Sequence, residues 1–300
     1  MGKSPSASLP SSTKCPPVAN RMEMDSLVST QWLADNLDAE DLVVLDATMH
    51  LPDSPRKSSV EFVERHVPGA RFLDLVSFVD TASPVPKALP GARQFADRLS
   101  QMGIEPESRV VLYDDSQIRS AARAWFIFRL YGFDQVAVLD GGLGKWKSEG
   151  RPLEQGAASP AQSTYPAPHA VREVRSKTEM LANCRSCAEQ VVDARDAARF
   201  AGEDGSGSEG HIPGAANVHY PALLAADGTY RSAEEIGSIF AAAGVDLDRP
   251  VVTSCNSGMT ACVLAFGLHL AGKDDVSVYD GSWLEWSDDP DLPKEKGASR

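Results

Sequence analysis

Residues 274–286, DDVSVYDGSWLEW, repeat residues 134–146, DQVAVLDGGLGKW. Three further segments of the first half recur in the second half in the same order, each about 140 to 147 residues later. These are LVVLDAT (42–48) with QVVDAR (190–195), ERHVPGA (64–70) with EGHIPGA (209–215), and RVVLYD (109–114) with PVVTSC (250–255). Four matches in one order indicate a tandem duplication.

Each copy alternates short, valine-rich runs with helical patterns. Runs such as 110–113 and 251–253 have the length and composition of buried strands. Helical patterns such as 233–243 and 261–271 end at a glycine, as helices commonly do. The alternation predicts two α/β domains, each with a mainly parallel sheet flanked by helices.

The repeat divides the chain into five expected parts. They are a tail (1–24), a first domain (25–150), a linker (151–175), a second domain (176–290) and a second tail (291–300). The linker holds four prolines, so we expect an extended, semi-rigid strap. The first tail is rich in serine and has no acid before Glu23, as in organelle-targeting segments, but its prolines oppose an amphipathic helix. A disordered extension and a targeting segment both remain open.

Composition excludes several classes of partner. The formal net charge of -13 argues against nucleic acid and anionic membranes, which need clustered Lys and Arg. No run of about 18 apolar residues is present, so we expect no membrane span. The five cysteines are an odd number and follow no secretory signal, which favours free thiols in the cytoplasm or mitochondrion.

The two copies differ at the end of one predicted strand, where open α/β sheets bind ligands. The third matched pair places Asp114 there in the first copy and Cys255 in the second. A short loop containing Gly258 leads from Cys255 to a helix that begins near Ala261. Loop N–H groups and the helix N-terminus would favour a thiolate, or a persulfide anion, on Cys255. The alternative is a buried cysteine that packs as a small apolar residue.

The loop CNSGMT (255–260), the paired H-[IV]-P-G-A segments and YDGSWLEW resemble the rhodanese and 3-mercaptopyruvate sulfurtransferase family over about residues 25–287. The resemblance implies two tandem rhodanese-like domains, of which only the second is catalytic, in agreement with Asp114 opposite Cys255. It implies an enzyme that carries sulfane sulfur as a Cys255 persulfide from a small-molecule donor to cyanide or a thiol acceptor such as thioredoxin or glutathione. It implies no cofactor and no metal.

Within the family, the side chains after the cysteine indicate the donor. Members that use thiosulfate carry Arg and Lys there, whereas Asn256 and Ser257 are neutral. The mercaptopyruvate branch usually has Gly followed by Ser or Thr, so Ser257 matches and Asn256 departs. The family pattern also places a substrate-carboxylate arginine in DARDAARF (193–200). The expected substrate-binding residues are therefore Arg199, Asn256, Ser257, Gly258, Met259 and Thr260.

The donor assignment favours 3-mercaptopyruvate, with pyruvate released, and thiosulfate is the alternative. Mercaptopyruvate members often have a second arginine before the second H-[IV]-P-G-A segment, but AGEDGSGSEG (201–210) has no basic residue. Arg195 and Arg123 are open candidates for this function. Arg199 itself could instead be a surface arginine on a short helix.

The family is thought to move protons through a Ser–His–Asp relay. By resemblance, Ser257 and His66 join Cys255 as catalytic residues, and Asp53 is a guess for the aspartate. His211 stands at the same repeat position as His66, so a structural role for His66 remains open.

Three other functions are disfavoured by residue pattern. A cysteine phosphatase needs Arg in a C-x5-R loop, but Ala261 stands there. A structural zinc site needs a second cysteine pair besides Cys184 and Cys187. A non-catalytic rhodanese-like binding module would lack the cysteine or its loop, and both are present.

Overall fold

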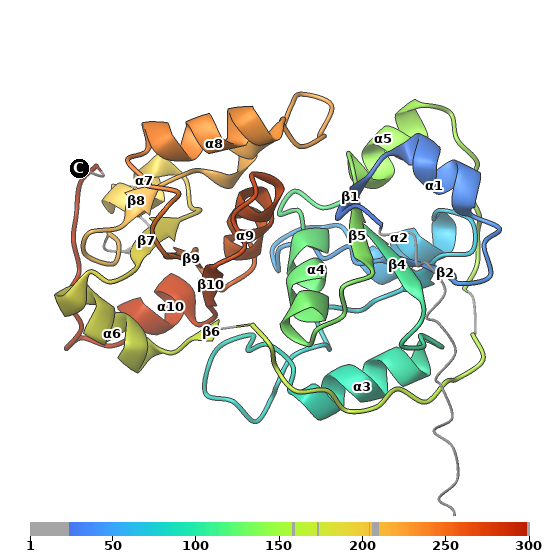
Figure 1. The fold of residues 1–300 in the computed structure, drawn as a ribbon, viewed down its shortest axis with the longest axis horizontal. Coiled ribbons are helices and arrows are strands. Elements are labelled where there is room, and N and C mark those ends of the chain that lie inside the picture. Colours follow the sequence, from blue (N-terminus) through green and yellow to red (C-terminus); the bar gives the residue numbers. More distant parts are fainter. Residues whose placement is uncertain (1–23, 158–159, 173, 204, 206–209, 299–300) are drawn as a thin grey trace, which may run out of the picture.

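The computed structural model describes residues 24–157, 160–172, 174–203, 205 and 210–298 (Figure 1). The expected first tail (1–24) therefore lies almost entirely outside the described residues. The described chain forms two five-stranded parallel sheets, one in each half. This confirms the predicted α/β class and the duplication. Among the helices of the described ranges, none has the length and apolar character needed to cross a membrane.

The first domain has the strand order β1-β5-β4-β2-β3. Its strands are β1 (Leu27–Val28), β2 (Leu42–Asp46), β3 (Arg71–Phe72), β4 (Arg109–Tyr113) and β5 (Val136–Leu139). Its helices are α1 (Thr30–Asn36), α2 (Ser58–Glu64), α3 (Ala92–Gln101), α4 (Ala121–Leu130) and α5 (Gly142–Ser148).

The second domain repeats this order as β6-β10-β9-β7-β8. Its strands are β6 (Val174–Arg175), β7 (Gln190–Asp193), β8 (Ala216–Asn217), β9 (Val251–Ser254) and β10 (Val276–Tyr279). Its helices are α6 (Lys177–Ser186), α7 (Ala197–Ala201), the 3-10 helix η1 (Tyr220–Leu223), α8 (Ala233–Ala242), α9 (Ala261–Leu270) and α10 (Ser282–Ser287).

Two helices of the second domain begin at capping boxes. The Ser176 hydroxyl accepts from the Glu179 backbone N–H, and the Glu179 carboxylate accepts from the Ser176 N–H at 2.8 Å. Ser232 and Glu235 repeat the arrangement, with the reciprocal bond at 3.0 Å. Each box satisfies two backbone donors that the helix leaves unpaired, which fixes where α6 and α8 begin.

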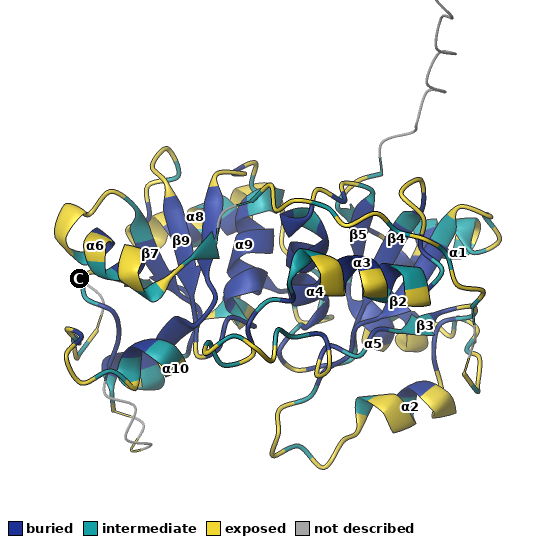
Figure 2. Cartoon of the chain, turned by 90° about the horizontal axis from the view of Figure 1, so that it is seen from below, coloured by how far each residue is buried: buried dark blue, intermediate teal, exposed yellow. Residues whose placement is uncertain are grey.

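Helices α4 and α9 are buried on nearly all sides because they face each other between the two sheets (Figures 1 and 2). The ring of Trp125 on α4 meets Phe266 on α9 edge-on, with centroids 4.8 Å apart. A helix that is apolar all round is typical of such a buried position. The loops that lead from β4 into α4 and from β9 into α9 therefore lie at the domain boundary. The second of them, residues 255–260, is the nucleophile loop.

Two aspartates at matched positions of the repeat, Asp140 and Asp280, each accept a hydrogen bond from the other domain. Asp140 of the first domain accepts from the Tyr230 N–H at 2.8 Å, and Asp280 of the second accepts from the Leu89 N–H at 2.7 Å. Asp280 is buried and Asp140 is partly buried, and carboxylates withdrawn from water need partners, so each bond constrains how the domains meet.

The linker lies along the first domain. Ser163 and Tyr165 donate backbone N–H groups to Ser100 at the end of α3, and Val171 donates to the Leu130 carbonyl. The last segment also packs, since His211 and Glu295 exchange both backbone hydrogen bonds at 2.8 and 2.9 Å. Described residues 291–298 therefore extend the second domain rather than forming a free tail.

Candidate functional site

Cys255 lies directly after β9, at the carboxyl end of the second sheet. Its neighbour across the sheet is Ala194, since the Ala194 N–H donates to the Ser254 carbonyl at 2.9 Å. Cys255 is 1% exposed. The sulfur thus lies where the sheet end meets the start of α9, the position that ligands occupy in open α/β folds.

The loop after Cys255 is tied to Ser282, a residue that the sequence analysis did not identify. The N–H groups of Cys255 and Gly258 both donate to Ser282 Oγ at 3.1 Å. Ser282 Oγ donates in turn to the Tyr279 carbonyl at 2.8 Å and lies 4.0 Å from Cys255 Sγ. We expected the loop amides to point to the sulfur. Two of them, from Cys255 and Gly258, instead point to the Ser282 hydroxyl beside it.

The other loop amides remain available. In the described part of the chain, the backbone N–H groups of Asn256, Ser257, Met259 and Thr260 have no hydrogen-bond acceptor. Such donors are normal at a helix start, where they create a site for negative charge. With them the loop can stabilise an anion at the strand end.

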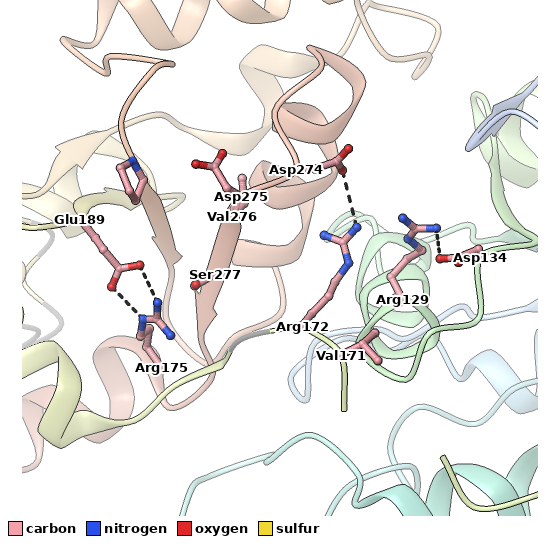
Figure 3. Close-up of a pocket in the computed structure, with 11 residues that line it drawn as sticks. Arg129, Asp134, Val171, Arg172, Arg175, Glu189, Asp274, Asp275, Val276 and Ser277 are labelled. Carbon is pink, nitrogen blue, oxygen red and sulfur yellow. Dashed lines mark hydrogen bonds and ion pairs between the residues drawn. The ribbon is translucent and has the colours of Figure 1, made fainter. Parts of the chain in front are cut away.

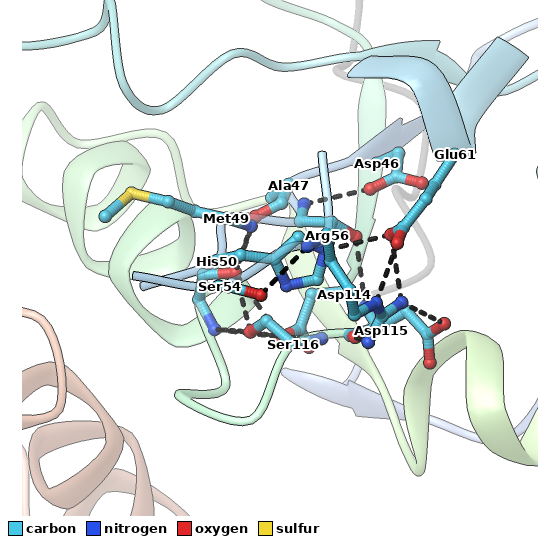
Figure 4. Close-up of polar contacts among 12 residues, drawn as sticks. Asp46, Ala47, Met49, His50, Ser54, Arg56, Glu61, Asp114, Asp115 and Ser116 are labelled. Atoms are coloured by element: carbon cyan, nitrogen blue, oxygen red, sulfur yellow. Dashed lines mark hydrogen bonds and ion pairs between the residues drawn. The ribbon is translucent and has the colours of Figure 1, made fainter. Parts of the chain in front are cut away.

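The first domain shows the same loop occupied by a carboxylate (Figure 4). Asp114 Oδ2 accepts from the backbone N–H groups of Ser116 at 3.3 Å and Ser120 at 2.9 Å. Burial raises the pKa of Asp114, and these hydrogen bonds oppose the rise. The first copy thus directs backbone donors at the side chain on the strand end, and the second copy places a cysteine at that position.

Asp46, at the end of β2 in the first domain, gives a stability prediction. Burial raises its pKa to about 6, against hydrogen bonds from Thr48 and Tyr113. Because the folded state holds this proton more tightly than the unfolded chain does, the group favours folding most at low pH. That contribution is lost as the pH rises through about 6. We expect it to lower the free energy of unfolding by about 1 kcal/mol between pH 5 and pH 8.

Urea unfolding of the wild type and Asp46→Asn at both pH values measures this effect. The amide cannot ionise, so the variant should lose this part of the pH dependence. An equal fall in both proteins would show that Asp46 is not its source.

His66 has a contact set that the second copy repeats. Its Nδ1 lies 2.7 Å from the Phe62 carbonyl oxygen, its ring stacks on Phe62, and Nε2 lies 3.9 Å from Glu154. His211 makes the same contacts with Phe200 and Glu295. Across the described residues no contact joins His66 to Ser257 or Cys255. These contacts give His66 a structural role in its turn, and the relay stays a prediction that the structure does not assemble.

Arg199 lies on α7, which begins at the capping residue Asp196. Its Nε donates to Asp196 at 2.6 Å, and its side chain is 43% exposed. It follows β7, whose last residue Asp193 pairs with Ser254, the last residue of β9. Arg199 is therefore anchored at the same sheet end as Cys255, with terminal guanidinium nitrogens that, within the described ranges, have no protein partner.

The two alternative arginines are buried in other contacts. Arg195 forms a bidentate pair with Asp193, donates to the Gly210 carbonyl and stacks over Trp283. Arg123 is 3% exposed and binds Asp280 and the Gly258 carbonyl. Each guanidinium is thus engaged by the protein, although Arg123 contacts the nucleophile loop.

The repeat could have identified Ser282 from the sequence. It stands at the position of Gly142, and both residues adopt a left-handed backbone with φ of +52° and +56°. Glycine takes that conformation freely, whereas serine is strained in it. Ser282 thus adopts a conformation that favours glycine, and its hydroxyl is what distinguishes this position from Gly142 in the first copy.

A hollow of about 540 Å³ lies elsewhere (Figure 3). It is lined by the first residue of β10 and by Pro250, just before β9, so it lies at the amino ends of the strands, opposite Cys255. Its arginines form the ion pairs Arg129–Asp134, Arg172–Asp274 and Arg175–Glu189. We therefore place the functional site at the nucleophile loop and not in this hollow.

Comparison with known proteins identifies a rhodanese-like domain in each half of the chain. The family model of the rhodanese-like domain matches residues 29–149 and 176–289. The chain is 41% identical over 271 residues to human 3-mercaptopyruvate sulfurtransferase, covering 87% of this chain and 91% of that protein. It is 38% identical over 269 residues to chicken thiosulfate sulfurtransferase, covering 87% and 93%. The crystal structure of the 3-mercaptopyruvate sulfotransferase SseA from Escherichia coli matches with a TM-score of 0.80 and 34% identity. The match covers 87% of this chain and 99% of that one.

Proposed function

The chain belongs to the rhodanese family, and from that premise we propose that it is a sulfurtransferase that takes sulfur from 3-mercaptopyruvate through a persulfide on Cys255. The observation that carries the proposal is the placement of Cys255 at a strand end, in a loop whose free amides can stabilise an anion. Cysteine reacts as its thiolate, so this placement suits a nucleophile.

The proposed reaction has two half-reactions. The Cys255 thiolate attacks the sulfur of mercaptopyruvate, and the electron pair of the breaking C–S bond leaves with the carbon as the enolate of pyruvate. The thiol proton of the transferred sulfur passes to that enolate, leaving a Cys255 persulfide anion and pyruvate. An acceptor thiolate then attacks the outer sulfur, and Cys255 leaves as a thiolate. Covalent catalysis in two steps predicts ping-pong kinetics.

The loop side chains favour a ketoacid over thiosulfate. Asn256 and Ser257 carry no charge to bind a small dianion, whereas Arg199 offers an exposed guanidinium for a carboxylate. Thiosulfate remains the second candidate donor, because the chain is also 38% identical to relatives named thiosulfate sulfurtransferase. The proposed acceptor is a thiol such as thioredoxin or glutathione, or cyanide.

The expected compartment is the cytoplasm or the mitochondrion. One relative, 37% identical over 302 residues, is named mitochondrial thiosulfate/3-mercaptopyruvate sulfurtransferase 1 of Arabidopsis thaliana. That protein's name fits the second alternative for this chain. Fractionation of cells that express the full chain would decide between the two compartments.

Steady-state turnover with each donor tests the donor assignment. We expect the wild type to prefer mercaptopyruvate, and Arg199→Met to raise KM for it about 10- to 100-fold, because a charge-assisted bidentate contact is lost. Arg231→Met is a matched control, since Arg231 is 40% exposed and pairs with Glu235 on the same domain. A preference for thiosulfate in the wild type, or equal effects of the two substitutions, would contradict the assignment.

A further inference from the structure

The peptide group that joins Gly258 to Met259 is held from the first domain. Arg123, on α4, donates from Nη1 to the Gly258 carbonyl at 3.2 Å. Its Nη2 donates to Asp280 Oδ1 at 2.8 Å and to the Lys87 carbonyl at 3.1 Å. A buried guanidinium therefore crosses the domain boundary and ends on the nucleophile loop.

Two more contacts hold Gly258, one at its carbonyl and one at its own N–H. Cys262 Sγ donates to the same Gly258 carbonyl at 3.2 Å. Burial raises the pKa of Cys262 to about 12, so the thiol keeps its proton and its donor role at neutral pH. On the other side, the Gly258 N–H donates to Ser282 Oγ. Gly258 is thus held at both its N–H and its carbonyl.

Because the peptide group is planar, fixing the Gly258 carbonyl also fixes the direction of the Met259 N–H. In a trans peptide the carbonyl and the following N–H point in opposite directions. Since the Gly258 carbonyl faces Arg123, the Met259 N–H faces away from Arg123. That N–H has no acceptor in the described part of the chain, so it is free to bind a charged sulfur.

We propose that Arg123 is a positioning residue of the first domain, which directs the Met259 N–H toward the Cys255 sulfur and so stabilises its anion. For the persulfide, this inference rests on the proposed function. For the thiolate of the resting protein, it rests on the loop geometry alone. It gives the domain that lacks a nucleophile a part in the reactivity of the other domain.

The test must separate positioning from folding. Arg123→Met alone leaves Asp280 buried without its partner, a change that strongly destabilises proteins. The double variant Arg123→Met/Asp280→Asn avoids the orphaned charge and keeps an acceptor for the Leu89 N–H, and Asp280→Asn alone is its baseline. Arg123→Lys keeps the positive charge but has one ammonium nitrogen in place of the two terminal guanidinium nitrogens. Arg129→Met removes a guanidinium from the same helix, where it pairs with Asp134, and serves as the control.

The first readout is alkylation of the Cys255 peptide by iodoacetamide at pH 7 and pH 10, followed by mass spectrometry. We expect the double variant to react about tenfold more slowly than Asp280→Asn at pH 7, where the loop amides favour the sulfur anion. The difference should shrink to about twofold at pH 10, above the usual pKa of a cysteine thiol, where help from the loop matters less. Arg123→Lys should fall between them, and Arg129→Met should match the wild type. If the folded double variant and Asp280→Asn react at equal rates at pH 7, Arg123 serves only as an interdomain contact and the inference is overturned.

The second readout is single-turnover persulfide formation with mercaptopyruvate. We expect a fall of about tenfold in its rate with little change in donor affinity, because the affected interaction is made with the charged sulfur. A wild type that forms no persulfide would contradict the proposed function, while the alkylation rates would still decide the role of Arg123. If the double variant does not fold, Arg123→Lys decides, since it retains the pair with Asp280. Wild-type alkylation at pH 7 in that variant would then overturn the inference.

Discussion

Cys255→Ser is expected to lower turnover of mercaptopyruvate by about 10⁴-fold or more, because a serine hydroxyl neither ionises at neutral pH nor accepts sulfur as a persulfide. The measurements are pyruvate release with a small thiol as acceptor, and the mass of the protein after the donor alone. The wild type should gain the mass of one sulfur atom, and the variant should gain none.

The control for this substitution is Cys187→Ser. Cys187 is an exposed free cysteine at the end of α6, far along the chain from the nucleophile loop. It should keep wild-type turnover and persulfide formation. Retained activity in Cys255→Ser, or sulfur gained on another cysteine, would refute the proposed mechanism.

Gly258→Ala is expected to lower turnover about 100-fold and to lower the free energy of unfolding by roughly 2 to 4 kcal/mol. Gly258 has φ of +74°, and a Cβ there would lie 2.6 Å from the Asp280 carbonyl oxygen. Such a contact forces the loop to move. Any movement misdirects the amides on either side of Gly258 and strains the bonds to Ser282 and Arg123.

Gly244→Ala separates the two causes of that loss. Gly244, at the end of α8, has φ of +79°, but a methyl group added there would meet no neighbouring side chain or backbone within 4 Å. We expect a loss of about 1 kcal/mol from the left-handed backbone alone, and unchanged turnover. Thermal unfolding and steady-state turnover of both variants make the comparison. Equal losses of stability and activity in the two variants would show that the loop tolerates a side chain at Gly258.

Much of the fold was predictable from local pattern. The four repeated segments, the valine-rich runs and the glycines that end helices together predicted two parallel α/β domains, and the structure has them. The predicted end of the second domain was less accurate. Residues 291–298 look like a polar tail in sequence, but Glu295 pairs with His211, as Glu154 pairs with His66 in the first copy. That pairing joins segments about 84 residues apart, which no local pattern reports.

The site divides in the same way. Cys255 and its loop were predicted because one copy of the repeat has an aspartate where the other has a cysteine. Ser282 and Arg123 were missed as loop contacts, although Ser282 lies in a segment that the sequence singled out. Their role depends on atoms that come together across 24 and 135 residues of chain. His66 is a different case, since a family pattern gave it a relay that stays a prediction, and its contacts in the described residues do not join it to Ser257 or Cys255.

The sequence by itself determined the duplication, the α/β architecture and the position of the proposed nucleophile Cys255, because hydrophobic periodicity and strand-end placement are local properties that repetition makes visible. Only the tertiary structure decided which groups hold the nucleophile loop and from which domain they come. A hydrogen bond depends on the distance and angle between atoms, and the packing of α4 against α9 brings Arg123 to the Gly258 carbonyl. Spacing along the chain carries no record of that approach.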